Sequence, residues 1–214
     1  MRHNVYLWRG KQNRSMKKLY NTFALAVMSG IMIGFGGVVF LMCENRVVGS
    51  VLFSFGLLTI VCQGFALYTG RVGYFRQYGW AQMAATLAGN FVGTFLMGKL
   101  FSLTRLPIVE NVQGIVATKL ADDSLSLFVL AVGCGAMMYL AVDNYRKSKS
   151  WLFIIFPIVI FILSGFEHSI ANMFYLTLAD AWGLEALRLT VIGILGNAVG
   201  SWMVNAANFT LKEE

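Results

Sequence analysis

Two stretches of this sequence share one pattern: Gly89-Asn90-Phe91-Val92-Gly93 in the first half and Gly196-Asn197-Ala198-Val199-Gly200 in the second. Each follows an apolar segment that is interrupted at a Gly-Phe pair, Gly64-Phe65 in the first half and Gly165-Phe166 in the second. A twofold repeat of hydrophobic segments with breaks is typical of membrane transport proteins. Because the breaks of such proteins meet near the middle of the bilayer, we expect both halves to form one binding path there.

The composition indicates an all-α membrane protein. Hydrophobic residues make up 57% of the chain and charged residues only 13%, and the mean hydropathy is +0.67. Since a spanning helix needs about 20 residues, the sequence predicts six spans, at 19–43, 47–69, 80–101, 125–142, 151–178 and 187–209. We therefore expect residues 1–214 to form a single six-helix transmembrane pore domain, in which residues 1–16 are a short basic cytoplasmic arm.

The net charge of +7 follows the topology of the predicted spans. Lysines and arginines gather before the first span, between the second and third, and between the fourth and fifth, with fewer on the opposite side. Cytoplasmic loops carry an excess of these residues, so both termini are expected in the cytoplasm. This distribution accounts for the basic charge without a nucleic-acid partner.

Neither a metal site nor an enzyme active site is expected. His3 and His168 are the two histidines, and no Cys/His spacing suits a metal ion. Ser164 or Ser169 would be a sequence neighbour of His168 rather than a converging nucleophile, which argues against an intramembrane hydrolase. No glycine-rich phosphate loop stands out, and no cofactor is expected.

The second break places ionisable residues near mid-bilayer, where they are expensive and usually face a cavity or a partner. His168 is either a buried histidine bonded to backbone or a group that donates to an anion and exchanges a proton near neutral pH. Its place at a helix break beside Glu167 favours the functional interpretation. Ser169 and Asn172 follow within one turn, and a half-helix that begins near Glu167 would direct its free N–H groups to the centre, where they suit an anion.

Thr69 ends the first break, and we interpret it as the counterpart of His168 in the other half. It is expected either to face His168 or to bond its own backbone carbonyl, as threonines in apolar helices often do. Asn90 and Asn197 occupy matched places in the two halves. Their amides are expected to satisfy backbone groups that the breaks leave free, in preference to a contact with substrate.

Two regions leave alternatives open. Residues 102–124 form the longest polar connection, which is expected outside the cell, either folded back over the pore mouth or as an ordered loop. Gly30 and Gly34 form a small-xxx-small pair that permits close helix contact. That contact could lie within one subunit or between subunits.

The run Ser-Gly-Phe-Glu-His-Ser-Ile-Ala-Asn-Met-Phe at 164–174 resembles the signature of the formate/nitrite transporter family. The Gly-Asn blocks resemble the third and sixth helices of that family, and Leu67-Tyr68-Thr69 is similar to its Leu-Phe-Thr at the first helix break. Gly79-Trp80-Ala81-Gln82-Met83 resembles its third-helix entry. The resemblance covers residues 17–209.

The resemblance implies an aquaporin-like fold of two inverted repeats with broken second and fifth helices. It also implies a homopentamer with one pore per subunit, in a prokaryotic-type cytoplasmic membrane. The pore centre would be His168, Thr69, Asn172 and Glu167. The constrictions would be Phe53, Leu57, Leu67, Tyr68, Met138 and Phe161, with Lys119 as the vestibule charge. The helix breaks would be supported by Gly64, Gly165, Asn90 and Asn197.

Four positions depart from the family pattern. Tyr68 replaces a phenylalanine, Met138 stands where a smaller residue is common, Ala66 replaces a glutamate, and Gly135 replaces an asparagine. We expect a channel or transporter for small monovalent anions of the formate, nitrite or hydrosulfide type, linked to protons through the central histidine. The alternative is an aquaporin-like channel for small neutral solutes, and a non-conducting sensor is disfavoured because it needs no buried polar pair.

Overall fold

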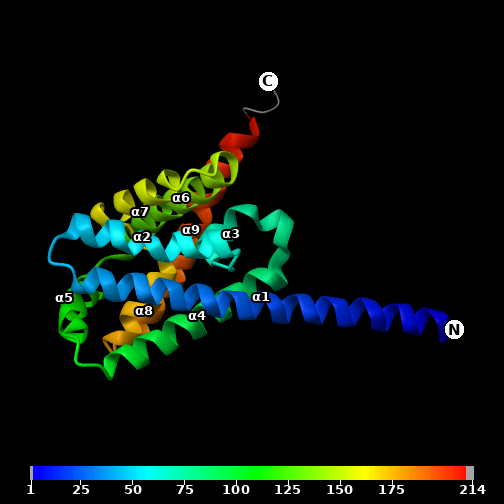
Figure 1. The fold of residues 1–214 in the computed structure, drawn as a ribbon, viewed down its shortest axis with the longest axis horizontal. Helices are drawn as coiled ribbons and strands as arrows, with labels where there is room; N and C mark the ends of the chain where they lie inside the picture. Colours follow the sequence, from blue (N-terminus) through cyan, green and yellow to red (C-terminus); the bar gives the residue numbers. More distant parts are fainter. Residues whose placement is uncertain (1, 211–214) are drawn as a thin grey trace.

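The computed structural model describes the backbone of residues 2–210 and the side chains of residues 15–207. These residues are helical apart from short turns, and none of them lies in a strand. The elements in chain order are α1 (Arg2–Met42), α2 (Arg46–Gln63), α3 (Tyr68–Arg71), the 3-10 turn η1 (Val72–Tyr74), α4 (Phe75–Ser102), α5 (Ile108–Ala121), α6 (Ser124–Ser148), α7 (Leu152–Leu163), α8 (Ser169–Leu178) and α9 (Leu184–Thr210). Figure 1 shows a bundle beyond which the N-terminal part of α1 extends.

The six predicted spans correspond to α1, to α2 with α3, to α4, to α6, to α7 with α8, and to α9. Four helical segments are long and apolar enough to cross a membrane: Ser15–Met42, Arg46–Gln63, Ser124–Ser148 and Leu184–Ala207. The apolar helices α7 and α8 are shorter, with 12 and 10 residues, because one hydrophobic stretch is divided at a break. The arm predicted over residues 1–16 continues the first span as part of α1, and the side chains of 1–14 lie outside the described residues.

Each half of the chain is held by one close helix pair. In the first half α1 packs along α4, and in the second half α6 packs along α9. A Cβ atom at Gly30 would lie 2.4 Å from the Asn90 carbonyl oxygen, and one at Gly135 would lie 2.2 Å from the Asn197 carbonyl oxygen. Both positions therefore require glycine, which explains why Gly135 stands where an asparagine was expected.

The question of Gly30 and Gly34 is answered by the same packing. Gly30 faces the backbone of α4, and a Cβ at Gly34 would lie 2.6 Å from the Met97 Cβ atom on that helix. Both glycines thus serve contact between helices of one subunit.

The connection 102–124 contains a helix, α5, which the sequence interpretation missed. Ile108, Val112 and Val116 are buried at a spacing of four residues, so one side of α5 packs against the protein. Its neighbours are α1, α8 and α9. A helix of 14 residues with polar flanks resembles a loop in composition, and its apolar periodicity is the signal that could have found it.

Candidate functional site

The two helix breaks share one backbone geometry. Gly64 follows α2 with φ 69°, and Gly165 follows α7 with φ 70°, a left-handed conformation that favours glycine. The next N–H closes each break in the same way, since Phe65 N donates to Ile60 O and Phe166 N to Phe161 O, both at 2.9 Å. This is the bond pattern of a helix that is terminated by glycine.

Asn90 joins the first break to the α1–α4 pair. Its side-chain oxygen accepts a hydrogen bond from Tyr68 N at 2.9 Å. Its amide nitrogen donates to Ala26 O and to Ala66 O, both at 2.8 Å. One buried carboxamide thus bonds two backbone groups of the break and one carbonyl of α1.

Asn197 makes the same set of contacts in the second half. Its oxygen accepts from Ser169 N at 3.0 Å, and its nitrogen donates to Ala131 O and to Glu167 O at 2.8 Å. Both asparagines are fully buried. These contacts describe a backbone brace, in which both N–H donors of each amide are already used.

The asparagine contacts also align the two halves and correct one prediction. Because Tyr68 and Ser169 bond equivalent atoms, Leu67 is the counterpart of His168, and Thr69 corresponds to Ile170. Thr69 is therefore not the repeat partner of His168. It lies two residues further along its own half, at the start of α3, whereas His168 immediately precedes α8.

Thr69 and His168 nevertheless meet at the centre of the molecule. Thr69 Oγ1 lies 3.0 Å from His168 Nε2, and both residues are buried. The other ring nitrogen, Nδ1, accepts a hydrogen bond from Ala171 N at 3.1 Å and so caps the start of α8. Because an amide N–H can only donate, Nδ1 carries no proton here, and the proton of the neutral ring lies on Nε2, facing Thr69.

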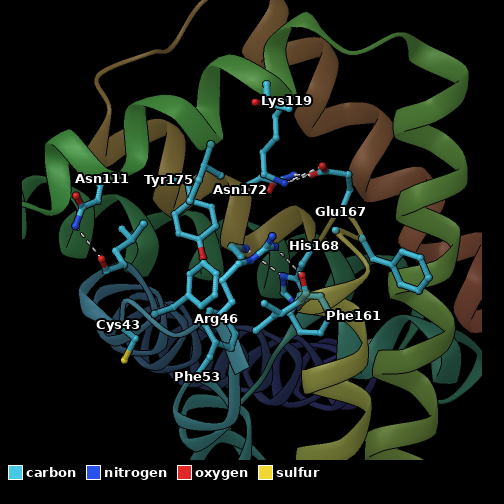
Figure 2. Close-up of a pocket in the computed structure, with 18 of the residues that line it drawn as sticks. Cys43, Arg46, Phe53, Asn111, Lys119, Phe161, Glu167, His168, Asn172 and Tyr175 are labelled. Atoms are coloured by element: carbon cyan, nitrogen blue, oxygen red, sulfur yellow. Dashed lines mark hydrogen bonds and ion pairs between the residues drawn. The ribbon is translucent and has the colours of Figure 1, made fainter. Parts of the chain in front are cut away.

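Glu167 forms a buried ion pair with Lys119. The Lys119 ammonium lies 2.7 Å and 2.6 Å from the two carboxylate oxygens, and the side chains are 16% and 5% exposed. Asn172 donates to the same carboxylate at 2.7 Å (Figure 2). Lys119 was predicted as a vestibule charge, and the structure adds that its charge is balanced by Glu167. The contact was missed because it depends on the docking of α5.

A cavity of about 650 Å³ leads to His168 from the side of α5. Its wall includes Phe53 and Phe161, whose rings pack edge to face with centroids 6.0 Å apart. The Phe161 ring lies 5.7 Å from the His168 ring. Figure 2 shows a further residue, Arg46, that reaches into this cavity and that the sequence interpretation did not select.

A second cavity of about 260 Å³ lies at the C-terminal ends of α2 and α6. Leu57 and Leu67 line it, together with three basic residues, Arg71, Arg146 and Lys149. His168 lines the first cavity, and Leu67 and Gly70, which are close to Thr69 in the chain, line the second. Neither Thr69 nor His168 lines the second cavity.

Two of the predicted constriction residues line neither cavity. Met138 is 1% exposed and packs in the core. Tyr68 is buried, and its hydroxyl donates to Ile194 O at 3.1 Å, so the hydroxyl that departs from the family pattern is bonded to α9. Within residues 15–207 no group of three metal-ligating side chains lies together.

The apolar helices, their breaks and the polar centre define an integral membrane transport protein. A family model described as "Formate/nitrite transporter" matches residues 7–210, and the chain belongs to that family, which comprises transporters and not enzymes. The resemblance seen in the sequence is thereby confirmed.

The relatives include the "Formate channel FocA" of Escherichia coli (strain K12), which is 30% identical over 190 residues, 75% of this chain and 67% of FocA. The "Nitrite transporter NirC" of the same strain is 26% identical over an alignment of 195 residues that covers 79% of this chain and 72% of NirC. A solved "Pentameric formate channel with formate bound" superposes with a TM-score of 0.80 at 23% identity, covering 92% of this chain and 98% of that one. The all-helical fold is therefore that of the channel.

Proposed function

We propose that this protein passes small monovalent anions of the formate and nitrite type across a prokaryotic cytoplasmic membrane. The observation that carries the proposal is the buried Thr69–His168 contact, with one cavity lined by His168 and a second lined by Leu67 and Gly70. The likeness to a formate channel, FocA, and to a nitrite transporter, NirC, supports this class of substrate. A wholly apolar barrier would be too costly for an anion to cross, so polar donors at the narrowest point are needed.

The proposed architecture has six spans in two inverted repeats, with the second and fifth spans broken. The matched braces of Asn90 and Asn197 and the matched glycines at 64 and 165 support the repeat. The pentameric assembly of the structural relative supports a homopentamer with one pore per subunit. The basic residues at the ends of α3 and α6 support cytoplasmic termini, by the positive-inside rule.

At the centre, the anion accepts hydrogen bonds from His168 Nε2–H and from the Thr69 hydroxyl in place of their mutual contact. The N-terminus of α8 adds its favourable dipole. Phe53 and Phe161 form the outer constriction, and Leu57 and Leu67 form the inner one. Tyr68 and Met138 support the constriction residues from within the protein core, since neither side chain lines either of the two cavities. Glu167, Lys119 and Asn172 hold the break in place from the outer side.

Proton linkage through His168 is the finer part of the proposal. The neutral ring has one proton, on Nε2, and is a hydrogen-bond donor rather than an acid strong enough for formate or nitrite. Transfer of a proton to the anion requires the doubly protonated ring, which must first release its Nδ1 contact with Ala171. The hydrogen-bond geometry supports the donor role directly, and proton transfer adds one further step.

The variant His168→Asn tests both roles, because an amide keeps a donor but cannot exchange a proton. If the anion leaves as its neutral acid, the variant loses the dependence of flux on an imposed pH gradient. We expect this loss in proteoliposome uptake of formate. Unchanged flux with an unchanged pH profile would contradict the proton link and leave the donor role, which Thr69→Val then tests.

A further inference from the structure

The cavity of about 650 Å³ beside α5, here called the outer cavity, is lined by two cations, Lys119 and Arg46. Their electrostatic surroundings differ. Lys119 contacts both oxygens of Glu167 within 2.7 Å, so its charge is compensated in the folded protein. Arg46, the first residue of α2, has no carboxylate within ion-pair distance among the described residues. Among the described residues its guanidinium makes one hydrogen bond, a long one of 3.5 Å from a guanidinium nitrogen to Ile162 O.

Figure 2 shows the Arg46 guanidinium directed into the cavity, in the neighbourhood of Phe161 and His168. The other ionisable groups of the cavity wall are Cys43, Glu44, Glu167, His168 and Tyr175. Glu44 is exposed, and the described side chains of Glu44 and Arg46 form no ion pair. Arg46 is therefore the cation that an anion entering this cavity meets with its charge available.

A guanidinium has five N–H donors in a planar fork. One of them is occupied, and only by the long bond to Ile162, so the fork can take two oxygens of a planar ligand. Formate and nitrite each present two oxygens in a plane, which match this fork, whereas hydrosulfide presents a single sulfur atom. An anion in a pore must also leave again, and an exposed arginine in contact with water binds weakly enough to allow it.

We propose that Arg46 is a specificity-determining residue of the outer mouth, which collects planar oxyanions and delivers them to the Phe53–Phe161 constriction. The inference rests on the proposed anion pore and adds the selection of substrate by shape. Lys119 is the structural cation of the break, and Arg46 is the cation that meets the substrate.

The experiment compares initial uptake of formate and of hydrosulfide by proteoliposomes at low ionic strength. The variants are Arg46→Gln, which removes charge and fork, and Arg46→Lys, which keeps the charge alone. The control is Arg105→Gln, an equal loss of charge at an exposed residue outside the cavity. We expect Arg46→Gln to raise the half-saturating formate concentration by about tenfold, and to weaken its dependence on added inert salt.

Arg46→Lys, which keeps the charge, is expected to take up hydrosulfide as the unmodified protein does, while its formate uptake stays impaired. Arg105→Gln is expected to behave as the unmodified protein with both anions. Formate uptake by Arg46→Gln that equals that of the unmodified protein would overturn the inference while leaving the anion pore intact. Full recovery of formate uptake in Arg46→Lys would overturn selection by the fork. Absence of any anion flux in the unmodified protein would overturn the proposed function, and the inference with it.

Discussion

At the scale of single residues, the two asparagine braces determine the geometry of the centre. Each carboxamide fixes where one half-helix begins, so the positions of Thr69 and His168 follow from amides on α4 and α9. The matched Gly-Asn blocks predicted a structural role for Asn90 and Asn197 from sequence alone. The offset of two residues between Thr69 and His168 could not be predicted, because it depends on which backbone N–H each amide accepts from.

Replacement of Asn197 by Ala removes three hydrogen bonds to buried backbone groups. Unsatisfied buried groups cost about 1–3 kcal/mol each, so we expect the melting temperature in detergent to fall by roughly 5–10 °C. Asn90→Ala should behave alike. Asn21→Ala, at an exposed position, is the matched control. A melting temperature of Asn197→Ala equal to that of the control would show that the brace contributes no stability.

At the scale of elements, the breaks join four helices to the centre, and α5 closes the second break from outside. Hydrophobicity alone was enough to predict an all-helical fold, and four of the helical segments are long and apolar enough to cross a membrane. It was not enough to place α5, which is short and amphipathic. The Lys119–Glu167 pair escaped prediction for the same reason, because Lys119 lies on the unrecognised helix α5, 48 residues before Glu167 in the second break.

The Lys119–Glu167 ion pair, which docks α5 on the second break, is expected to contribute to thermal stability. Removal of one partner leaves a buried charge, at a cost of about 3–5 kcal/mol, so Lys119→Met should strongly lower the melting temperature. The double variant Lys119→Met with Glu167→Gln removes both charges and keeps an acceptor for Asn172. We expect it to recover most of the loss in a thermal melt. Lys99→Met, which breaks the exposed pair with Asp180, is the control and should change little. A double variant no more stable than Lys119→Met would contradict a buried pair.

At the scale of the whole molecule, one cavity lies at the N-terminal end of α2 and is lined by His168, and a second lies at the C-terminal ends of α2 and α6 and is lined by Leu67 and Gly70. The outer cavity carries a compensated ion pair and an available arginine, and the inner one carries basic residues at its mouth. Membership of the formate/nitrite transporter family and the fold of the formate channel agree with this arrangement. The choice of anion depends on side-chain positions within the constrictions, and the sequence pattern records residue types there rather than widths.

The most direct measurement is uptake into proteoliposomes under an imposed pH gradient, with formate, nitrite, hydrosulfide and glycerol compared in the same preparation and His168→Ala beside the unmodified protein. The account predicts flux of at least one of the three anions that responds to the gradient and is strongly reduced by the substitution, with no glycerol flux. Flux of glycerol alone, or of no solute, would contradict an anion pore centred on Thr69 and His168.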